Sequence, residues 1–135
     1  MFFNQSAADS IAYNMIREAD RRVSDHFLVR EFASRDGSAA LLIHPRLVTL
    51  LEAVRTHFGR PVVIHSGYRS GAHNAAVGGS PRSKHLLGLA ADIVVRGVDA
   101  AVVARFCDGL DVGGLGRYPT FTHVDVAGEG RRWSK

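Results

Sequence analysis

Residues 44–67 read HPRLVTLLEAVRTHFGRPVVIHSG, and within this stretch a helical pattern passes directly into a strand pattern. The apolar side chains of the first part recur at the spacing of one helix face: Leu47, Leu50, Leu51, Val54 and Phe58. Pro45 suits the first turn of a helix, and Gly59 followed by Pro61 is typical of a helix end. The β-branched run after Pro61 is short and bounded by Gly67, which indicates a buried strand. We therefore expect a helix that ends near Gly59 and a strand that follows it at once.

The rest of the chain carries both helical and strand patterns. The predicted elements are an amphipathic helix over 8–23, a loop-like region over 68–88 with one helical turn near 73–77, a strand over 90–95, a helix over 99–110 and a strand over 121–127. Because helices and strands do not alternate regularly, we expect an α+β fold, in which helices pack against one face of a small antiparallel sheet. A parallel sheet is a less well supported alternative.

The 135 residues are expected to form one domain, spanning 1–135, because this length can bury a sizeable core and no linker or repeat interrupts it. The hydrophobic fraction of 46% and the charged fraction of 22% are typical of globular proteins, and no apolar run is long enough to span a membrane. The one cysteine, Cys107, excludes an internal disulfide and a cysteine-rich zinc site. Its apolar surroundings predict a buried thiol.

The net charge of +4 favours anionic partners, such as nucleic acid or an anionic cell wall. The basic residues are scattered, however, and form no stripe interleaved with aromatic residues. We therefore expect no nucleic-acid partner, and we expect the chain to be a monomer.

The strand predicted over 121–127 carries a histidine beside a carboxylate. Alternation along a strand places His123 and Asp125 on one face and Val124 on the other. The valine face is the one to bury, so His123 and Asp125 should point together toward a groove. A surface-facing pair on an antiparallel sheet is the simpler alternative.

Asp92 interrupts the apolar strand predicted over 90–95. An unpaired carboxylate is costly to bury, so it should face water, a cation or a metal ion. His85 lies seven residues earlier, an odd separation that would put the two side chains on opposite faces of one continuous strand. They can converge only if the chain turns between them, and Gly88 can supply that turn.

Two histidine nitrogens and one carboxylate oxygen form a common catalytic zinc site, in which a fourth position stays open. His85, Asp92 and His123 match that composition. Zinc held in this way acts as a Lewis acid on a carbonyl and lowers the pKa of water. The spacing of the three residues is moderately specific, and coincidence is the alternative.

Several short motifs follow one another along the chain: SGYRS, HN, VGG, S-x-H-x-x-G-x-A-x-D, GG-x-G-x-Y-P and F-x-H-V-D-V. In this order they resemble the zinc D-alanyl-D-alanine carboxypeptidase family, which also contains peptidoglycan endopeptidases and phage endolysins. The resemblance extends from about His26 to Trp133. It implies a hedgehog-like zinc peptidase fold, Zn²⁺ as cofactor, and cleavage of amide bonds next to D-amino acids in peptidoglycan stem peptides.

Carried over position by position, the resemblance implies that His85, Asp92 and His123 are the zinc ligands. Arg69 in SGYRS matches the arginine that binds a substrate carboxylate or the developing oxyanion. Its planar fork of donors suits a carboxylate, which agrees with that role. An ion pair with a carboxylate of the protein is the structural alternative for Arg69.

Two further residues are predicted to contact substrate. Ser83 lies in the motif that contains the first two ligands, and His73 matches the HN motif of the family. Capping of a turn is the structural alternative for Ser83.

The general base is where the chain departs from many relatives. They place Glu or Asp three residues before the last histidine ligand, whereas this chain has Thr120, which cannot take a proton from water. Relatives that end in F-x-H-V-D-V offer an aspartate two residues after that histidine, here Asp125. We predict Asp125 as the catalytic base, and orientation of a metal-bound histidine is its alternative role.

The absence of an acid at position 120 keeps a second function open, a zinc-binding module without hydrolytic activity, since the same fold occurs in the hedgehog signalling domain. The N-terminal MFFNQSAADSIAY has no basic segment followed by an apolar one, so no secretory signal is predicted. We therefore expect synthesis in the cytoplasm, although the expected substrate lies in the cell wall. A phage or prophage lysis enzyme fits both expectations, because it is released when the membrane is breached.

Overall fold

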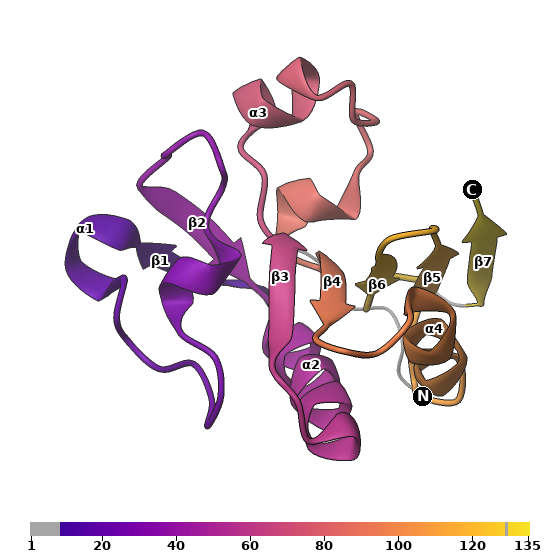
Figure 1. Ribbon diagram of the computed structural model, residues 1–135. Helices are drawn as coiled ribbons and strands as arrows, with labels where there is room; N and C mark the ends of the chain where they lie inside the picture. The colour runs from indigo at the N-terminus through magenta and orange to yellow at the C-terminus, as the bar shows by residue number, and fades with distance from the viewer. Residues whose placement is uncertain (1–8, 129) are drawn as a thin grey trace.

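The computed structural model describes residues 9–128 and 130–135, which form two sheets flanked by helices (Figure 1). The strands are β1 (Ile11–Asn14), β2 (Ala40–Ile43), β3 (Val62–Ser66), β4 (Ala90–Val95), β5 (Gly114–Arg117), β6 (Thr122–Asp125) and β7 (Arg131–Ser134). The helices are α1 (Met15–Glu18), α2 (Pro45–Phe58), α3 (Gly71–Ala76) and α4 (Ala100–Asp108), and the short 3-10 helices are η2 (Val29–Phe32) and η3 (Lys84–Leu87). The predicted α+β class is confirmed.

The main sheet contains five strands in the order β3-β4-β6-β5-β7. β3, β4, β6 and β5 pair antiparallel with one another, as the sequence predicts. β7 joins the edge of the sheet parallel to β5, an added parallel pair that the sequence does not predict. Strands β1 and β2 form a separate antiparallel pair.

Helices α2 and α4 pack against the main sheet and against each other. α2 begins at Pro45 and ends at Gly59, whose φ of 63° lies in the left-handed region and whose N–H donates to the carbonyl of Arg55. The helix and strand predicted over 44–67 are therefore confirmed. The buried core contains, among others, Leu51, Val54, Ile93, Leu115 and Val124.

The helix predicted over residues 8–23 is wrong. Ile11–Asn14 form strand β1 and only Met15–Glu18 are α-helical, while residue 8 lies outside the described part of the chain. Main-chain pairing of β1 with β2 decides the conformation here, which local periodicity does not register. Ile16, which belongs to the supposed apolar stripe, is 83% exposed.

The loop-like region over 68–88 contains two short helices, α3 and η3. η3 ends at Gly88, whose φ of 75° supplies the predicted turn. A Cβ at Gly88 would lie 2.6 Å from the carbonyl carbon of Leu42, so only glycine fits between η3 and β2. Among residues 9–128 and 130–135, no helix is both long and apolar enough to cross a bilayer.

Candidate metal centre

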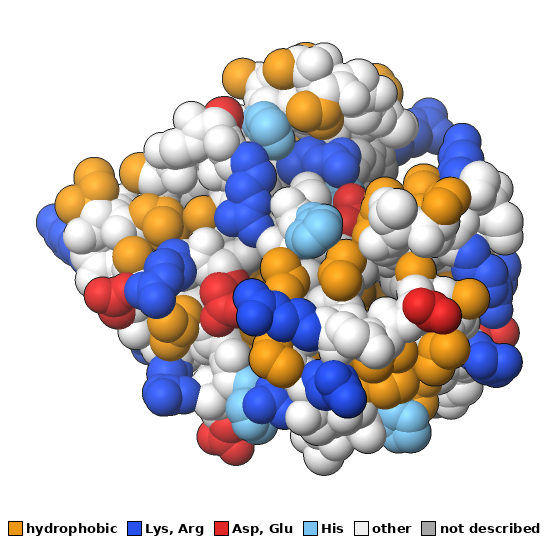
Figure 2. All heavy atoms as spheres, viewed as in Figure 1, with side chains coloured by type: hydrophobic (Ala, Val, Ile, Leu, Met, Phe, Trp, Pro, Cys, Tyr) orange, Lys and Arg blue, Asp and Glu red, His pale blue; other side chains and the backbone are white. Residues whose placement is uncertain are grey.

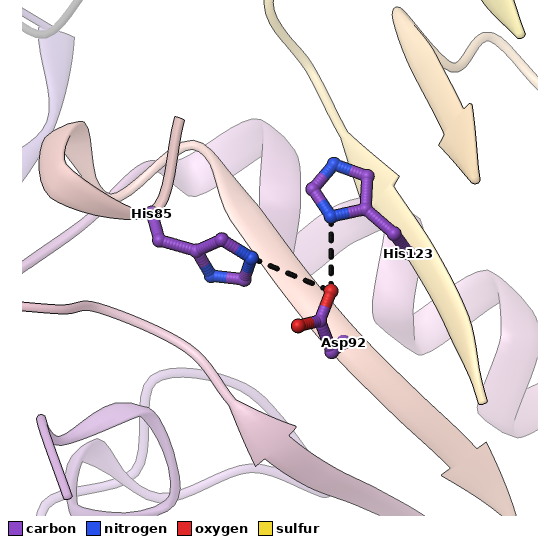
Figure 3. Close-up of side chains that lie close together, drawn as sticks. All are labelled: His85, Asp92 and His123. Atoms are coloured by element: carbon purple, nitrogen blue, oxygen red, sulfur yellow. Dashed lines mark hydrogen bonds and ion pairs between the residues drawn. The ribbon is translucent and has the colours of Figure 1, made fainter. Parts of the chain in front are cut away.

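Three side chains that are far apart in the sequence meet beside the main sheet (Figure 3). His85, Asp92 and His123 are buried, and one donor atom from each lies within 4.8 Å of the others. Nε2 of His85 lies 3.3 Å from Oδ1 of Asp92, and Nδ1 of His123 lies 2.9 Å from the same oxygen. The structure thus brings together the three residues predicted as metal ligands, which we call the His-Asp-His cluster.

The sheet register and one turn explain this convergence. Asp92 on β4 and His123 on β6 are direct partners across antiparallel strands, so their side chains project from the same face of the sheet. His85 lies on η3, and the turn at Gly88 leads the chain back into β4. Val124, which lies between His123 and Asp125 in the sequence, belongs to the core as predicted.

A hydrogen bond fixes the orientation of the His85 imidazole. Its Nδ1 lies 2.7 Å from the carbonyl oxygen of Gly67. Because a carbonyl oxygen only accepts, Nδ1 carries a proton, and Nε2 is the nitrogen that faces Asp92. A backbone carbonyl behind a histidine is a common device for orienting a metal ligand.

His123 lies between two carboxylates. Its Nδ1 faces Asp92, while its Nε2 lies 2.8 Å from Oδ2 of Asp125. Burial lowers the pKa of His123, but the hydrogen bonds to Asp125 and Asp92 outweigh burial and raise that pKa above its ordinary value. Burial raises the pKa of Asp92, yet hydrogen bonds from His123 and His85 hold it well below its usual range. Asp92 therefore stays ionised at neutral pH.

Asp125 is fully buried, and its carboxylate accepts hydrogen bonds from several donors. Besides His123, it accepts the N–H of Ala127 at 3.1 Å and a hydrogen bond from the guanidinium of Arg131. Burial raises its pKa, but the hydrogen bond from His123 and the charges of His123 and Arg131 hold the pKa of Asp125 below its usual range. The carboxylate is thus stabilised in its charged form.

The donor set of the cluster fits Zn²⁺. Zinc binds histidine nitrogens and carboxylate oxygens at about 2.0–2.2 Å with tetrahedral geometry, which places neighbouring donors roughly 3.3 Å apart. The distance of 3.3 Å between His85 and Asp92 matches that spacing, and the 2.9 Å between His123 and Asp92 is close to it. Two imidazoles and one carboxylate also leave a fourth position, as in catalytic zinc sites.

A cavity of about 270 Å³ opens beside the cluster. Its walls include the cations Arg69, Arg82, Lys84 and Arg131 and the aromatic residues Tyr118 and Trp133. Lys and Arg side chains also gather below α3 on the face seen in Figure 2. Two carboxylates, Asp92 and Asp125, also line it, but the cations outnumber them, and this excess of positive charge favours an anionic ligand.

Arg69 lines this cavity with its guanidinium held in place. Its Nε donates to Oγ of Ser66 and its Nη1 donates to Oδ1 of Asn74, each at 3.2 Å. Its Nη2 lies 3.5 Å from Oδ2 of Asp92, so the alternative ion pair with a carboxylate of the protein is present as well. Asn74 is buried and donates to the carbonyl of Ser80, which ties the following loop to the arginine.

Of the other two residues predicted to contact substrate, one lines the cavity. Ser83 does so, and its Oγ also accepts the N–H of His85 at 3.3 Å, which is the predicted capping alternative. His73 is not among the described residues that line this cavity, and its N–H donates to Oγ of Ser70 at the start of α3.

Strand β7 adds two residues that the sequence analysis missed. Arg131 contacts Asp125, and the ring centroid of Trp133 lies 5.0 Å from that of His123. Nε1 of Trp133 donates to the hydroxyl of Tyr118 at 3.0 Å. The alternation of Arg131 and Trp133 was a possible signal of a shared strand face, but a four-residue strand gives little periodicity to detect.

Comparison with known proteins agrees with this geometry. A family model described as Peptidase M15 matches residues 23–126, which include the whole His-Asp-His cluster. The chain is also 39% identical over 106 residues to the zinc D-Ala-D-Ala carboxypeptidase of Streptomyces albus G. That alignment covers 72% of this chain and 41% of the relative, so the chain spans well under half of the relative's length. Because the family model matches most of the chain, the protein belongs to the Peptidase M15 family.

Proposed function

We propose that the chain is a zinc-dependent peptidase that cleaves an amide bond next to a D-amino acid in peptidoglycan stem peptides or crosslinks. The observation that carries this proposal is the buried His-Asp-His cluster beside a cation-lined cavity, in a chain of the Peptidase M15 family. The name of the relative from Streptomyces albus G supports the substrate class.

In this proposal His85, Asp92 and His123 hold zinc through the atoms that face one another, Nε2, Oδ1 and Nδ1. When bound, zinc supplies a Lewis acid for the scissile carbonyl and lowers the pKa of water. The three side chains are buried, so their charges and dipoles act with little screening by solvent.

Arg69 binds a substrate carboxylate or the developing oxyanion. Ser66 and Asn74 already hold its guanidinium, so little side-chain freedom is lost when substrate binds. Its Nη2 lies 3.5 Å from Asp92, which puts a positively charged donor next to the proposed zinc site. Ser83 lines the same cavity, and we propose it as a further hydrogen-bonding partner of substrate.

Asp125 has two candidate roles, and its contacts favour one of them. A general base must reach its proton through a free oxygen. Both oxygens of Asp125 already accept hydrogen bonds, Oδ2 from His123 and Oδ1 from Ala127 and Arg131, and the side chain is fully buried. We therefore propose that Asp125 orients His123 instead of accepting the proton itself.

The test is incubation of the zinc-loaded protein with purified peptidoglycan and with a synthetic stem peptide that ends in D-Ala-D-Ala, followed by mass spectrometry. Release of free D-alanine identifies a carboxypeptidase, and new peptide ends in the crosslinked wall identify an endopeptidase. The matched negative control is His85→Ala, which removes one proposed ligand. Failure to release any product from several wall types contradicts the peptidase proposal.

A zinc-binding module without hydrolytic activity is the second candidate. It is favoured by Thr120, which lies where many relatives carry a carboxylate. This candidate predicts that the chain binds zinc tightly and releases nothing in the same assay.

A further inference from the structure

Two glycines of β5 leave a gap beside the metal centre. Gly114 is paired with Asp125 on β6 and with Arg131 on β7, so these three residues lie in one row across the sheet. A Cβ on Gly114 would collide with Oδ2 of Asp125 and lie 2.7 Å from Nη2 of Arg131. No residue larger than glycine therefore fits at position 114. The space over Gly114 is filled by the side chains of Asp125 from β6 and Arg131 from β7.

The next row repeats this arrangement. Gly116 is paired with His123 on β6 and with Trp133 on β7. A Cβ on Gly116 would lie 2.6 Å from Nε1 of Trp133. The indole fills the space over this glycine, and its ring centroid lies 5.0 Å from that of His123. β7 thus reaches the metal centre across β5 in two successive rows.

The contacts of Arg131 form a chain that ends at the cluster. Its guanidinium donates to Oδ1 of Asp125 and to the carbonyl of Ala127, the latter at 2.8 Å. Oδ2 of Asp125 then lies 2.8 Å from Nε2 of His123. Because the Asp125 carboxylate accepts from the Ala127 N–H and the Arg131 guanidinium, it is an acceptor toward His123 as well, so Nε2 carries a proton and Nδ1 is the nitrogen that faces Asp92.

We propose that β7 is a positioning strand for the metal centre, in which Arg131 holds Asp125, Asp125 holds the His123 imidazole, and Trp133 packs beside that ring. The proposal rests on the proposed zinc site and deepens it. Arg131 and Trp133 lie beyond residue 126, where the match to the family model ends, so their roles come from the contacts in this chain. Partners of this kind fix the tautomer and ring orientation of a ligand.

Arg131→Gln tests the strand, and Arg132→Gln is its matched control. Arg132 is the next residue on β7, and its Nε instead donates to Asp108 at 2.7 Å, away from the cluster. Zinc affinity is measured by competition with a chromophoric chelator. We expect Arg131→Gln to weaken zinc binding roughly tenfold and Asp125→Asn to weaken it by about 10- to 100-fold, as for other residues that orient a ligand. Arg132→Gln should stay within about twofold of the parent, and Arg131→Lys should recover part of the loss.

Equal zinc affinities for Arg131→Gln and Arg132→Gln would overturn the proposal. So would an Asp125→Asn variant that keeps its zinc affinity but loses turnover, because that result makes Asp125 the proton acceptor. Circular dichroism of the metal-free variants shows whether each is folded. If Arg131→Gln does not fold, the outcome rests on the nitrogen-15 chemical shifts of His123 in the zinc-loaded parent. A protonated Nε2 supports the proposal, and a zinc-bound Nε2 overturns it.

The zinc affinities and the nitrogen-15 shifts need no peptide substrate, so the two proposals fail in different ways. Weaker zinc binding by Arg131→Gln in a chain that releases no product leaves the positioning strand standing and removes the peptidase. If the chain releases product but Arg131→Gln does not change its zinc affinity, the peptidase proposal stands and the positioning strand is removed. A parent chain that binds no zinc removes both.

Discussion

Each histidine of the cluster has one nitrogen engaged by the protein and the other aimed at Asp92. The carbonyl of Gly67 holds Nδ1 of His85, whereas Asp125 holds Nε2 of His123. Opposite ring nitrogens are therefore left to face the carboxylate. Since both rings are oriented before a metal arrives, binding should cost little rearrangement of side chains.

The first prediction compares His85 on η3 with His65 on strand β3. His85→Ala should weaken zinc binding by more than about a hundredfold, because it removes a donor and not merely a residue that orients one. His65→Ala should leave the affinity unchanged, since His65 is an exposed residue of β3. Chelator competition measures both. Similar affinities for the two variants would contradict the assignment of His85.

The second prediction concerns the thiol of Cys107, which is buried as the sequence predicts. Burial raises the pKa of Cys107 to about 12. The thiolate is the reactive form, so Ellman's reagent at pH 8 should modify the native protein far more slowly than the urea-unfolded chain.

The same pKa also links the thiol to folding. In the unfolded chain the thiol ionises near its ordinary pKa of 9.0, while in the folded protein it stays protonated at that pH. Stability should therefore fall as pH rises above about 9, and urea unfolding of Cys107→Ala should show less of this fall. An equally rapid reaction with Ellman's reagent in the native and unfolded states would contradict the burial.

Among the elements, α3 depends on contacts outside itself. It has six residues, fewer than an isolated helix needs to be stable. Oγ of Ser70 accepts the N–H of His73 at 3.0 Å and donates to Asp36 at 2.6 Å, so one hydroxyl caps the helix and anchors it. Asn74 in this helix accepts a hydrogen bond from Arg69, which lines the cavity. The cap at Ser70 therefore also helps to hold Arg69 in place.

Ser70→Ala removes this cap. The variant should lose about 1 kcal/mol of unfolding free energy, the usual cost of an N-cap deletion. Hydrogen exchange of the α3 amides should quicken while that of α2 stays unchanged, because α2 has its own cap at His44. Thr49→Ala, at an exposed position of α2, is a control and should change stability by less than about 0.5 kcal/mol. A loss no larger than that of Thr49→Ala would contradict the role of Ser70.

Two glycines at helix ends give a matched pair for backbone conformation. Gly59 has a φ of 63°, whereas Gly71 has no positive φ, and a Cβ at either position would meet nothing within 4 Å. Gly59→Ala should therefore destabilise the protein by about 1 kcal/mol through backbone strain alone, while Gly71→Ala should be neutral or slightly stabilising. Urea denaturation of both variants measures the difference. Equal effects would show that the left-handed conformation at Gly59 is not required.

Across the whole molecule, the parts that could be predicted are those whose signal is local. α2 shows its apolar stripe, its proline start and its glycine end within one stretch of sequence. Asp92 and His123 could be predicted because polar residues on apolar strands need a partner, and His85 because it completes a common zinc-binding set within the ordered motifs.

What could not be predicted depends on contacts between distant segments. Ile11–Asn14 has helical periodicity and is a strand because β2 pairs with it. Gly114 and Gly116 weaken the strand pattern of β5, because glycine is rare in strands. In the structure, a larger residue at either position would collide with Arg131 or Trp133. The sequence favours Asp125 as the catalytic base, whereas the hydrogen bonds that support our proposal of an orienting role depend on how β6, β7 and the turn between them fold together.

The last prediction concerns how zinc binding and folding are linked. The unfolded chain separates the three donors, so zinc binds the folded state preferentially and stabilises it by mass action. At a free zinc concentration 100 times the dissociation constant, the gain is about 2.7 kcal/mol. For a domain of this size that should raise Tm by roughly 10 °C, measured by calorimetry with and without a chelator. Arg132→Gln should show the full shift, and His85→Ala should show almost none. An equal shift in His85→Ala would mean that zinc stabilises the protein from a site other than the His-Asp-His cluster.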